Sequence, residues 1–254
     1  MQYQTLNNLP QPRTLLLKGP PGSGKTTIAA QLPKVVIFNF DNNLAALQKM
    51  PLDMQKEIKI ISPKKGLDHK TQGSLIWSKF IEQLEEVVQD NNVTTIVIDS
   101  LTTLTECLMD FIVGSSMPNV QPEIQHWGTY SRYLKWLGDS FLCVDGLDKN
   151  IVIIAHEQTI MDSLEKQVKY TLNIGSRMKD SFELYFTDCW RLSTKGLPNQ
   201  NPRFLVGVVP TNLYSAKCSI PGLPPEFVFK DKKDKICQIF RDSIPSLEPT
   251  GSTH

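Results

Sequence analysis

The chain has 254 residues, of which 40% are hydrophobic and 21% are charged, and its formal net charge is +1. This composition provides for a sizeable α/β core and excludes a disordered chain, while the balanced charge means that any nucleic-acid surface must be a local patch. The five cysteines lack paired or metal-binding spacing, and the first residues lack a signal-peptide pattern. We therefore expect reduced thiols and a cytoplasmic protein that does not span a membrane.

Short apolar runs alternate with helical patterns along most of the chain. These patterns predict strands at 14–18, 35–40, 57–61, 94–99 and 151–155, and helices from 25 onward, at 74–90, at 101–113 and at 127–144. Residues 187–193 and 203–209 predict a late antiparallel hairpin at the sheet edge. Such alternation is typical of an α/β fold with a mostly parallel sheet flanked by helices. The helical spacing of Trp and Tyr in WGTYSRYLKW (127–136) predicts that these rings pack in the core.

The composition changes after the predicted hairpin. Proline and charged residues become frequent in PGLPPEFVFKDKKDK and IPSLEPTGSTH. This composition predicts a tail with little regular structure. We therefore divide the chain into an N-terminal segment (1–12), a core (13–210) and a C-terminal extension (211–254).

A phosphate-binding loop is predicted at GPPGSGKTT, which fits G-x-x-x-x-G-K-[ST] between a predicted strand and a predicted helix. In such a loop, glycines let backbone N–H groups point inward at phosphate oxygens, and the helix N-terminus faces the anion. Lys25 is expected to reach the β- and γ-phosphates of ATP, and the Thr26 hydroxyl to bind Mg²⁺. The predicted nucleotide-binding residues are Gly19, Pro20, Pro21, Gly22, Ser23, Gly24, Lys25, Thr26 and Thr27.

Asp99 ends the apolar strand TTIVID, at the sheet edge where α/β proteins bind ligands. We expect it to hold Mg²⁺ opposite Thr26. The alternative is that Asp99 caps the following helix, although Ser100 or Thr102 can do so instead. Residue 100 is serine, where many ATPases have the glutamate that activates water, so the base must come from elsewhere.

Two carboxylates are candidates for this base. Asp41 follows the strand VVIFNF, and Glu157 follows IVIIAH. Either one, placed in line with the γ-phosphate, would orient and deprotonate a water molecule; for Asp41 the alternative is a solvated turn residue. His156 and Glu157 are also expected to contact the γ-phosphate and to transmit its loss to the next loop. The alternative is a hydrogen-bonded pair at the strand end.

GPPGSGKTT, the acid after VVIFNF, IVIDSLTTL and IVIIAHE together resemble the RecA-like P-loop ATPase core over about residues 13–210. In more detail they resemble short phage-encoded nucleotide-binding proteins of the single-strand-annealing type, often described as phage AAA family ATPases. The resemblance implies a DNA-dependent ATPase that binds single-stranded DNA and promotes annealing or homologous recombination. It also implies a ring or filament of identical subunits, with a single-strand DNA-binding protein as a further partner. The RecA-like layout favours Asp41 over Glu157 as the base, although that family has glutamate at this position.

The stretch after IVIIAHE, residues 158–176, is the expected DNA-binding loop. Lys166, Lys169 and Tyr170 lie in it, and Arg177 and Lys179 follow. Basic side chains of this kind track a single-strand backbone, and an interleaved ring stacks on a base. A solvated loop, or a plain strand at VKYTLNI, are the alternatives.

Two other functions use the same phosphate loop. A small-molecule kinase is one alternative, but the six arginines are scattered rather than gathered in a lid. A nucleotide switch that binds ATP without hydrolysing it is the other alternative, because no glutamate follows Asp99 to act as the base.

Overall fold

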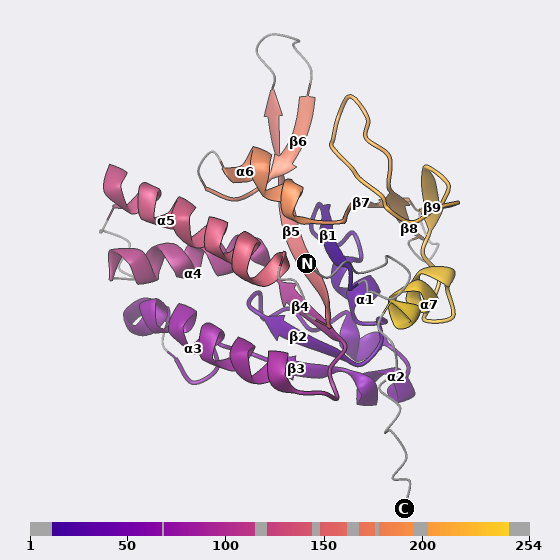
Figure 1. The fold of residues 1–254 in the computed structure, drawn as a ribbon, viewed down its shortest axis with the longest axis horizontal. Coiled ribbons are helices and arrows are strands. Elements are labelled where there is room, and N and C mark those ends of the chain that lie inside the picture. Colours follow the sequence, from indigo (N-terminus) through magenta and orange to yellow (C-terminus); the bar gives the residue numbers. More distant parts are fainter. Residues whose placement is uncertain are drawn as a thin grey trace, which may run out of the picture.

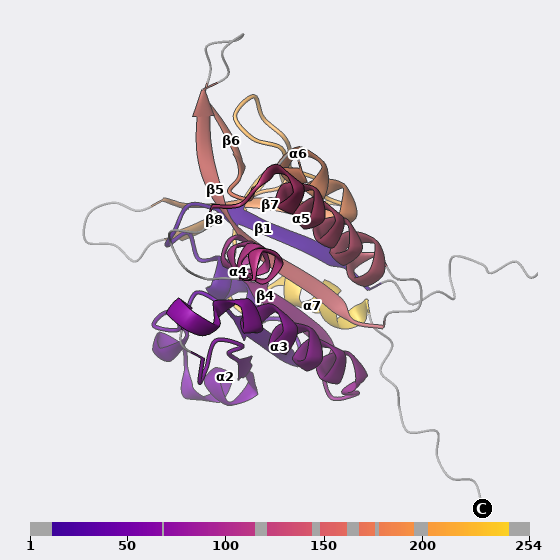
Figure 2. The ribbon, with the colours of Figure 1, turned by 90° about the vertical axis from the view of Figure 1, so that its left-hand side faces the viewer.

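A computed structural model describes residues 12–67, 69–114, 121–143, 148–161, 168–175, 178–195 and 203–243. Lys166 and Arg177, two of the residues predicted to contact DNA, lie outside these ranges. Within them, a central sheet carries helices on both faces, and a hairpin projects from one end (Figures 1 and 2). No helix in the described ranges combines the length and the apolar character that a bilayer crossing requires.

The strands follow the predicted order closely. They are β1 (Thr14–Gly19), β2 (Val35–Asn39), β3 (Lys59–Ile61), β4 (Thr95–Asp99), β5 (Asn150–Met161), β6 (Val168–Leu172), β7 (Asp188–Lys195), β8 (Arg203–Gly207) and β9 (Glu226–Val228). In the sheet they are ordered β3-β2-β4-β5-β1-β7-β8-β9, and β6 pairs with β5 outside this path. The pairs from β3 to β7 are parallel, whereas β7–β8, β8–β9 and β5–β6 are antiparallel. The α/β class and the late antiparallel hairpin are therefore confirmed.

The helices connect these strands. They are α1 (Lys25–Ala29), α2 (Leu52–Glu57), α3 (His69–Gln89), α4 (Leu101–Val113), α5 (Ile124–Leu137), α6 (Met178–Ser181) and α7 (Lys235–Asp242). Short turns complete the set: η2 (Leu47–Lys49), η3 (Gly138–Leu142, a π-helical turn) and η4 (Phe182–Tyr185).

The core has two halves, one on each face of the sheet. Because successive strand residues point to opposite faces, Leu16 and Phe38 pack under α3, α4 and α5, while Leu15 and Leu17 face α1 and α7. Both sets are almost fully buried. The strands are apolar on both faces for this reason, as expected for parallel strands covered on two sides.

The C-terminal extension contains regular structure, so the prediction of a tail with little of it is wrong for β9 and α7. β9 adds a strand to the sheet beside β8. Asp234 caps α7, because its side chain accepts a hydrogen bond from the Ile236 N–H, and the helix buries Ile236, Cys237 and Phe240. The helix is short, but it covers the same core half as α1.

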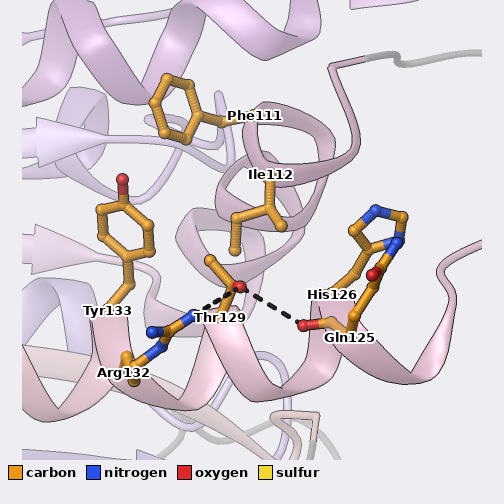
Figure 3. Close-up of a pocket in the computed structure, with 7 residues that line it drawn as sticks. All are labelled: Phe111, Ile112, Gln125, His126, Thr129, Arg132 and Tyr133. Atoms are coloured by element: carbon orange, nitrogen blue, oxygen red, sulfur yellow. Dashed lines mark hydrogen bonds between the residues drawn. The ribbon is translucent and has the colours of Figure 1, made fainter.

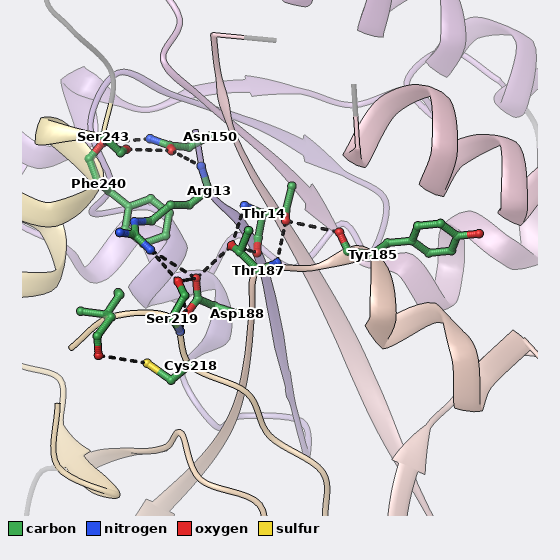
Figure 4. Close-up of polar contacts among 11 residues, drawn as sticks. Arg13, Thr14, Asn150, Tyr185, Thr187, Asp188, Cys218, Ser219, Phe240 and Ser243 are labelled. Atoms are coloured by element: carbon green, nitrogen blue, oxygen red, sulfur yellow. Dashed lines mark hydrogen bonds and ion pairs between the residues drawn. The ribbon is translucent and has the colours of Figure 1, made fainter. Parts of the chain in front are cut away.

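Polar side chains fasten this extension to the amino end of the sheet (Figure 4). The Asn150 amide, at the start of β5, donates to the carbonyl of Phe240 (2.9 Å) and accepts from the N–H of Arg13 (2.9 Å). The buried Asp188, at the start of β7, accepts from the N–H of Ser219 (2.6 Å) and pairs with Arg13 (3.6 Å). Segments far apart in sequence therefore meet here.

The predicted loop after IVIIAHE forms two antiparallel strands at 158–161 and 168–172, and only 173–175 among its described residues are irregular. β5 runs on to Met161, well past the predicted end, and β6 pairs with it from Glu157↔Leu172 to Met161↔Val168. The alternative of a plain strand at VKYTLNI is therefore the one observed. This hairpin stands out from the sheet above the remaining strands (Figures 1 and 2).

Candidate nucleotide site

The site lies at the carboxyl edge of the parallel strands, where the sheet register brings four segments together. Gly19 at the end of β1 is level with His156, and Asn39 at the end of β2 is level with Asp99. A pocket at this edge is lined by Pro21, Gly22, Ser23, Gly24, Lys25, Thr26, Thr27, Asp41, Asn43, Ala46, Asp99, His156 and Phe204. Most of the predicted site residues therefore share one pocket.

The phosphate loop has the backbone that its sequence predicts. Gly22 and Gly24 have φ values of 75° and 87°, in the left-handed region that favours glycine. At Gly24 a Cβ atom would also lie 2.4 Å from the Phe204 ring, so a larger residue would be both strained and blocked. α1 begins directly after Gly24, which places its N-terminus at the pocket.

Lys25 is folded back over the loop. Its Nζ donates to the carbonyl oxygens of Gly19 and Pro20, each at 2.8 Å. Burial lowers the pKa of Lys25 to about 8, although the carboxylates of Asp99, Glu157 and Asp41 oppose this shift. These carbonyl oxygens are neutral acceptors, and phosphate oxygens can replace them as hydrogen-bond partners of the ammonium.

Thr26 and Asp99 meet as the magnesium prediction requires. The Thr26 hydroxyl donates to Asp99 Oδ2 at 2.6 Å. Burial raises the pKa of Asp99, and this one hydrogen bond only partly offsets the effect. Ser100 caps α4, accepting from the Thr103 N–H, so Asp99 does not serve as the cap. A buried carboxylate beside a hydroxyl is a hard oxygen donor pair that fits Mg²⁺.

Asp41 lines the same pocket as Asp99 and is held by three donors. His156 Nε2 donates to Oδ2 at 3.0 Å, and the hydroxyls of Ser100 (2.9 Å) and Thr103 donate to Oδ1. Burial alone would raise the pKa of Asp41, but these hydrogen bonds outweigh it and bring the pKa to about 2. Asp41 is therefore a fixed anion at neutral pH, and the solvated-turn alternative does not describe it.

Glu157 does not line the pocket. Both of its oxygens accept from Arg191 Nε (3.1 and 3.0 Å), and its side chain is only 3% exposed. Burial raises the pKa of Glu157 against the opposing charges of Arg191, Lys18 and Lys25. Of the two candidate bases, the structure brings only Asp41 into the pocket.

The described residues predicted to contact DNA lie on the hairpin and just after it. Lys169 and Tyr170 belong to β6, where Tyr170 is level with Thr159, and Lys179 lies on α6. The guanidinium of Arg191 covers one face of the Tyr170 ring at 4.3 Å. Arg191 therefore occupies one face of the ring that was predicted to stack on a base.

Two residues at or near this site were not predicted from the sequence. Phe204 of β8 lines the pocket against Gly24, and Arg191 of β7 joins Glu157, Tyr170 and Tyr214. Neither carries a motif, since both lie in ordinary strand sequences. Only the parallel pairing of β7 with β1, which places Arg191 beside Lys18, brings that strand to the site.

Two solved structures are similar to this chain over most of its length. The KaiC-like protein PH0186 from Pyrococcus horikoshii OT3 is 16% identical, with 87% of each chain covered and a TM-score of 0.47. The flagellar accessory protein FlaH from Methanocaldococcus jannaschii is 12% identical, with 87% of this chain and 86% of that chain covered and a TM-score of 0.43. Among curated proteins, none matches the sequence. Residues 11–217 match the family AAA_24, described as an AAA domain, and the chain therefore belongs to this family of P-loop ATPases.

Proposed function

We propose that the protein hydrolyses ATP in this pocket and that the bound nucleotide controls its binding of single-stranded DNA in annealing or homologous recombination. The observation that carries the proposal is the convergence of Lys25, Thr26, Asp99, Asp41 and His156 on one pocket. A nucleotide there places its phosphates on the loop N–H groups and on Lys25. Thr26 and Asp99 would hold Mg²⁺, which neutralises charge on the phosphates when it is bound.

Asp41 is the group that would position the attacking water. Water attacks the γ-phosphorus, the bond to the β-phosphate oxygen breaks, and ADP and phosphate leave. With a pKa of about 2, Asp41 is a weak base, so its main contribution is to accept a hydrogen bond and hold the water in line. His156 Nδ1 is buried and has no hydrogen-bond partner among the described residues, which leaves it for the nucleotide or the water.

The hairpin supports the DNA part of the proposal. β5 carries His156 into the pocket and then continues into the projecting hairpin, so one strand joins the pocket to the hairpin. Lys169 on β6 and Lys179 on α6 add positive charge near it. Basic side chains and an aromatic ring such as Tyr170 suit a single strand.

The first test is ATP turnover, with and without single-stranded DNA, in the native protein and in Asp41→Asn. Turnover stimulated by DNA and reduced about tenfold or more by Asp41→Asn, with unchanged ATP affinity, supports the proposal. Asp53→Asn is the matched control, because the Asp53 side chain is 73% exposed on α2. Turnover that DNA does not change, together with no retention of a labelled single strand at low salt, would contradict the DNA part.

A non-hydrolysing nucleotide switch is the second candidate. The observation in its favour is that Asp41 already accepts three hydrogen bonds and is a weak base. Calorimetric binding of MgATP without any turnover in the native protein would favour the switch over the ATPase.

A further inference from the structure

The pocket at the phosphate loop is large enough for only part of a nucleotide. Its volume is about 180 Å³, whereas pockets that enclose a whole drug-sized ligand measure about 300–1,000 Å³. The loop, Lys25, Thr26 and Asp99 account for the triphosphate and the magnesium ion of the proposed function. The nucleoside is therefore left at the mouth of the pocket, where a further residue is needed to hold it.

The order of the strands indicates on which side the nucleoside lies. β1, which leads into the phosphate loop, lies between β5 and β7 in the sheet. Asp41, Asp99 and His156 come from the β2, β4 and β5 side of β1, and they mark the γ-phosphate end of the ligand. Phe204 of β8 is the one described residue that lines the pocket from the other side of β1. A nucleotide with its γ-phosphate at the carboxylates therefore has its base on the side of Phe204.

Phe204 is held in place beside the loop. It pairs with Thr194 of β7, and its carbonyl accepts from the N–H of Phe229 at 3.1 Å. Its ring packs on Gly24 of the loop, and its side chain is only partly buried. Among the described residues that line the pocket, His156 carries the only other aromatic ring, and it is hydrogen-bonded to Asp41. Phe204 is thus the ring available to the base.

We propose that Phe204 stacks on the nucleobase and makes the site selective for purine over pyrimidine nucleoside triphosphates. A phenyl ring has no hydrogen-bond donor or acceptor, so it holds a base by the face of the base and not by its edge. A purine has two fused rings and covers more of the phenyl ring than a pyrimidine does, so it gains more from stacking. The proposal rests on the proposed function in that a nucleoside triphosphate occupies this pocket.

A second pocket provides a control, because it also combines aromatic rings with a cation. It lies between α4 and α5, has a volume of about 430 Å³, and its lining includes Phe111, Arg132 and Tyr133 (Figure 3). The two pockets share no lining residue within the described part of the chain.

The rings of α5 are not all in the core. Tyr130 is 2% exposed, as predicted, but Trp136 is 43% exposed. The prediction that the rings of WGTYSRYLKW pack in the core is therefore wrong for Trp136.

The test is calorimetric titration of the full chain with the magnesium complexes of ATP, CTP and tripolyphosphate. The native protein should bind ATP more tightly than CTP. Phe204→Ala should weaken ATP binding about tenfold and CTP binding less, with tripolyphosphate binding unchanged because this ligand has no base. Phe204→Leu keeps an apolar side chain against Gly24 without the aromatic ring and should show the same selective loss, whereas Phe204→Tyr should bind ATP like the native protein.

Phe111→Ala removes a ring from the second pocket and should leave all three affinities unchanged. Far-UV circular dichroism shows whether each variant folds. The inference is overturned, with the nucleotide pocket left intact, if Phe204→Ala and Phe204→Leu bind ATP like the native protein or keep the native ratio of ATP to CTP affinity. An equal loss of tripolyphosphate binding would also overturn it, because the ring would then act on the loop and not on the base. A native protein that binds none of the three ligands would overturn the proposed function as well.

Discussion

Two buried aspartates at opposite ends of the sheet have different surroundings. Asp99, at the carboxyl end of β4, accepts a single strong hydrogen bond, from Thr26, and burial raises its pKa. Asp188, at the amino end of β7, is fully buried and accepts from the backbone and hydroxyl of Ser219 beside Arg13. The Asp99 carboxylate therefore has few hydrogen-bond partners for a buried charge, whereas the Asp188 carboxylate has several.

This difference separates a ligand site from a structural one. A buried charge needs compensation, and when the protein does not supply it fully, a bound cation can. Asp188 instead uses its partners to fasten the 217–219 segment to the sheet. The same residue type is thus predicted to serve binding at one end and stability at the other.

The largest expected effect is on stability at the amino end. Asp188→Ala removes the acceptor of the Ser219 N–H and the anion that pairs with the Arg13 guanidinium, and we expect a loss of about 3–5 kcal/mol in the free energy of unfolding. Urea denaturation followed by circular dichroism measures it. Asp53→Ala, at an exposed position, serves as control. A loss below about 1 kcal/mol would show that Asp188 is not a structural anchor.

The next effect is on catalysis at the carboxyl end. Asp99→Asn removes the charge that would hold Mg²⁺, so we expect turnover to decrease about a hundredfold or more, equivalent to about 3 kcal/mol. The free energy of unfolding should stay within about 0.5 kcal/mol or increase, because the buried charge is removed. Turnover assays and urea denaturation on the same samples test the pair of outcomes. An Asp99→Asn protein that hydrolyses ATP normally but unfolds easily would reverse the comparison.

The smallest effect concerns the pH dependence of nucleotide binding. The pKa of Lys25 is about 8 in the free protein, and phosphate contacts favour the charged form, so binding is strongest below pH 8. Above pH 8 we expect affinity to fall by up to about tenfold per pH unit. Calorimetry in buffers of different ionisation enthalpy should also detect proton uptake near pH 8. Lys25→Arg should show a flatter profile, since arginine stays charged; a native profile equally flat would refute the assignment.

Much of the carboxyl end was predictable because its signals are local. The strand, loop and helix around GPPGSGKTT and the helix at 101–113 are read directly from apolar spacing and glycine positions. Asp41 and His156 were found because each lies at or just after an apolar strand. Parallel strands then bring such residues to one edge.

The amino end was not predictable because its partners are distant in sequence. Asn150 and Phe240 are 90 residues apart, and Asp188 and Ser219 are 31 apart. α7 has only eight residues among charged ones, so its apolar spacing is too brief to stand out. The β5–β6 hairpin could not be distinguished from a loop in the sequence, because β5 continues into polar residues where the apolar periodicity ends.

The Asn150 side-chain amide donates to the Phe240 carbonyl, so this edge of the protein can close only after α7 has been synthesised. Until then the apolar surface that Ile236 and Phe240 cover is exposed to solvent on a nascent chain in which β1 to β9 have already been synthesised. A chaperone that recognises exposed apolar segments would therefore meet this protein late in its synthesis rather than early.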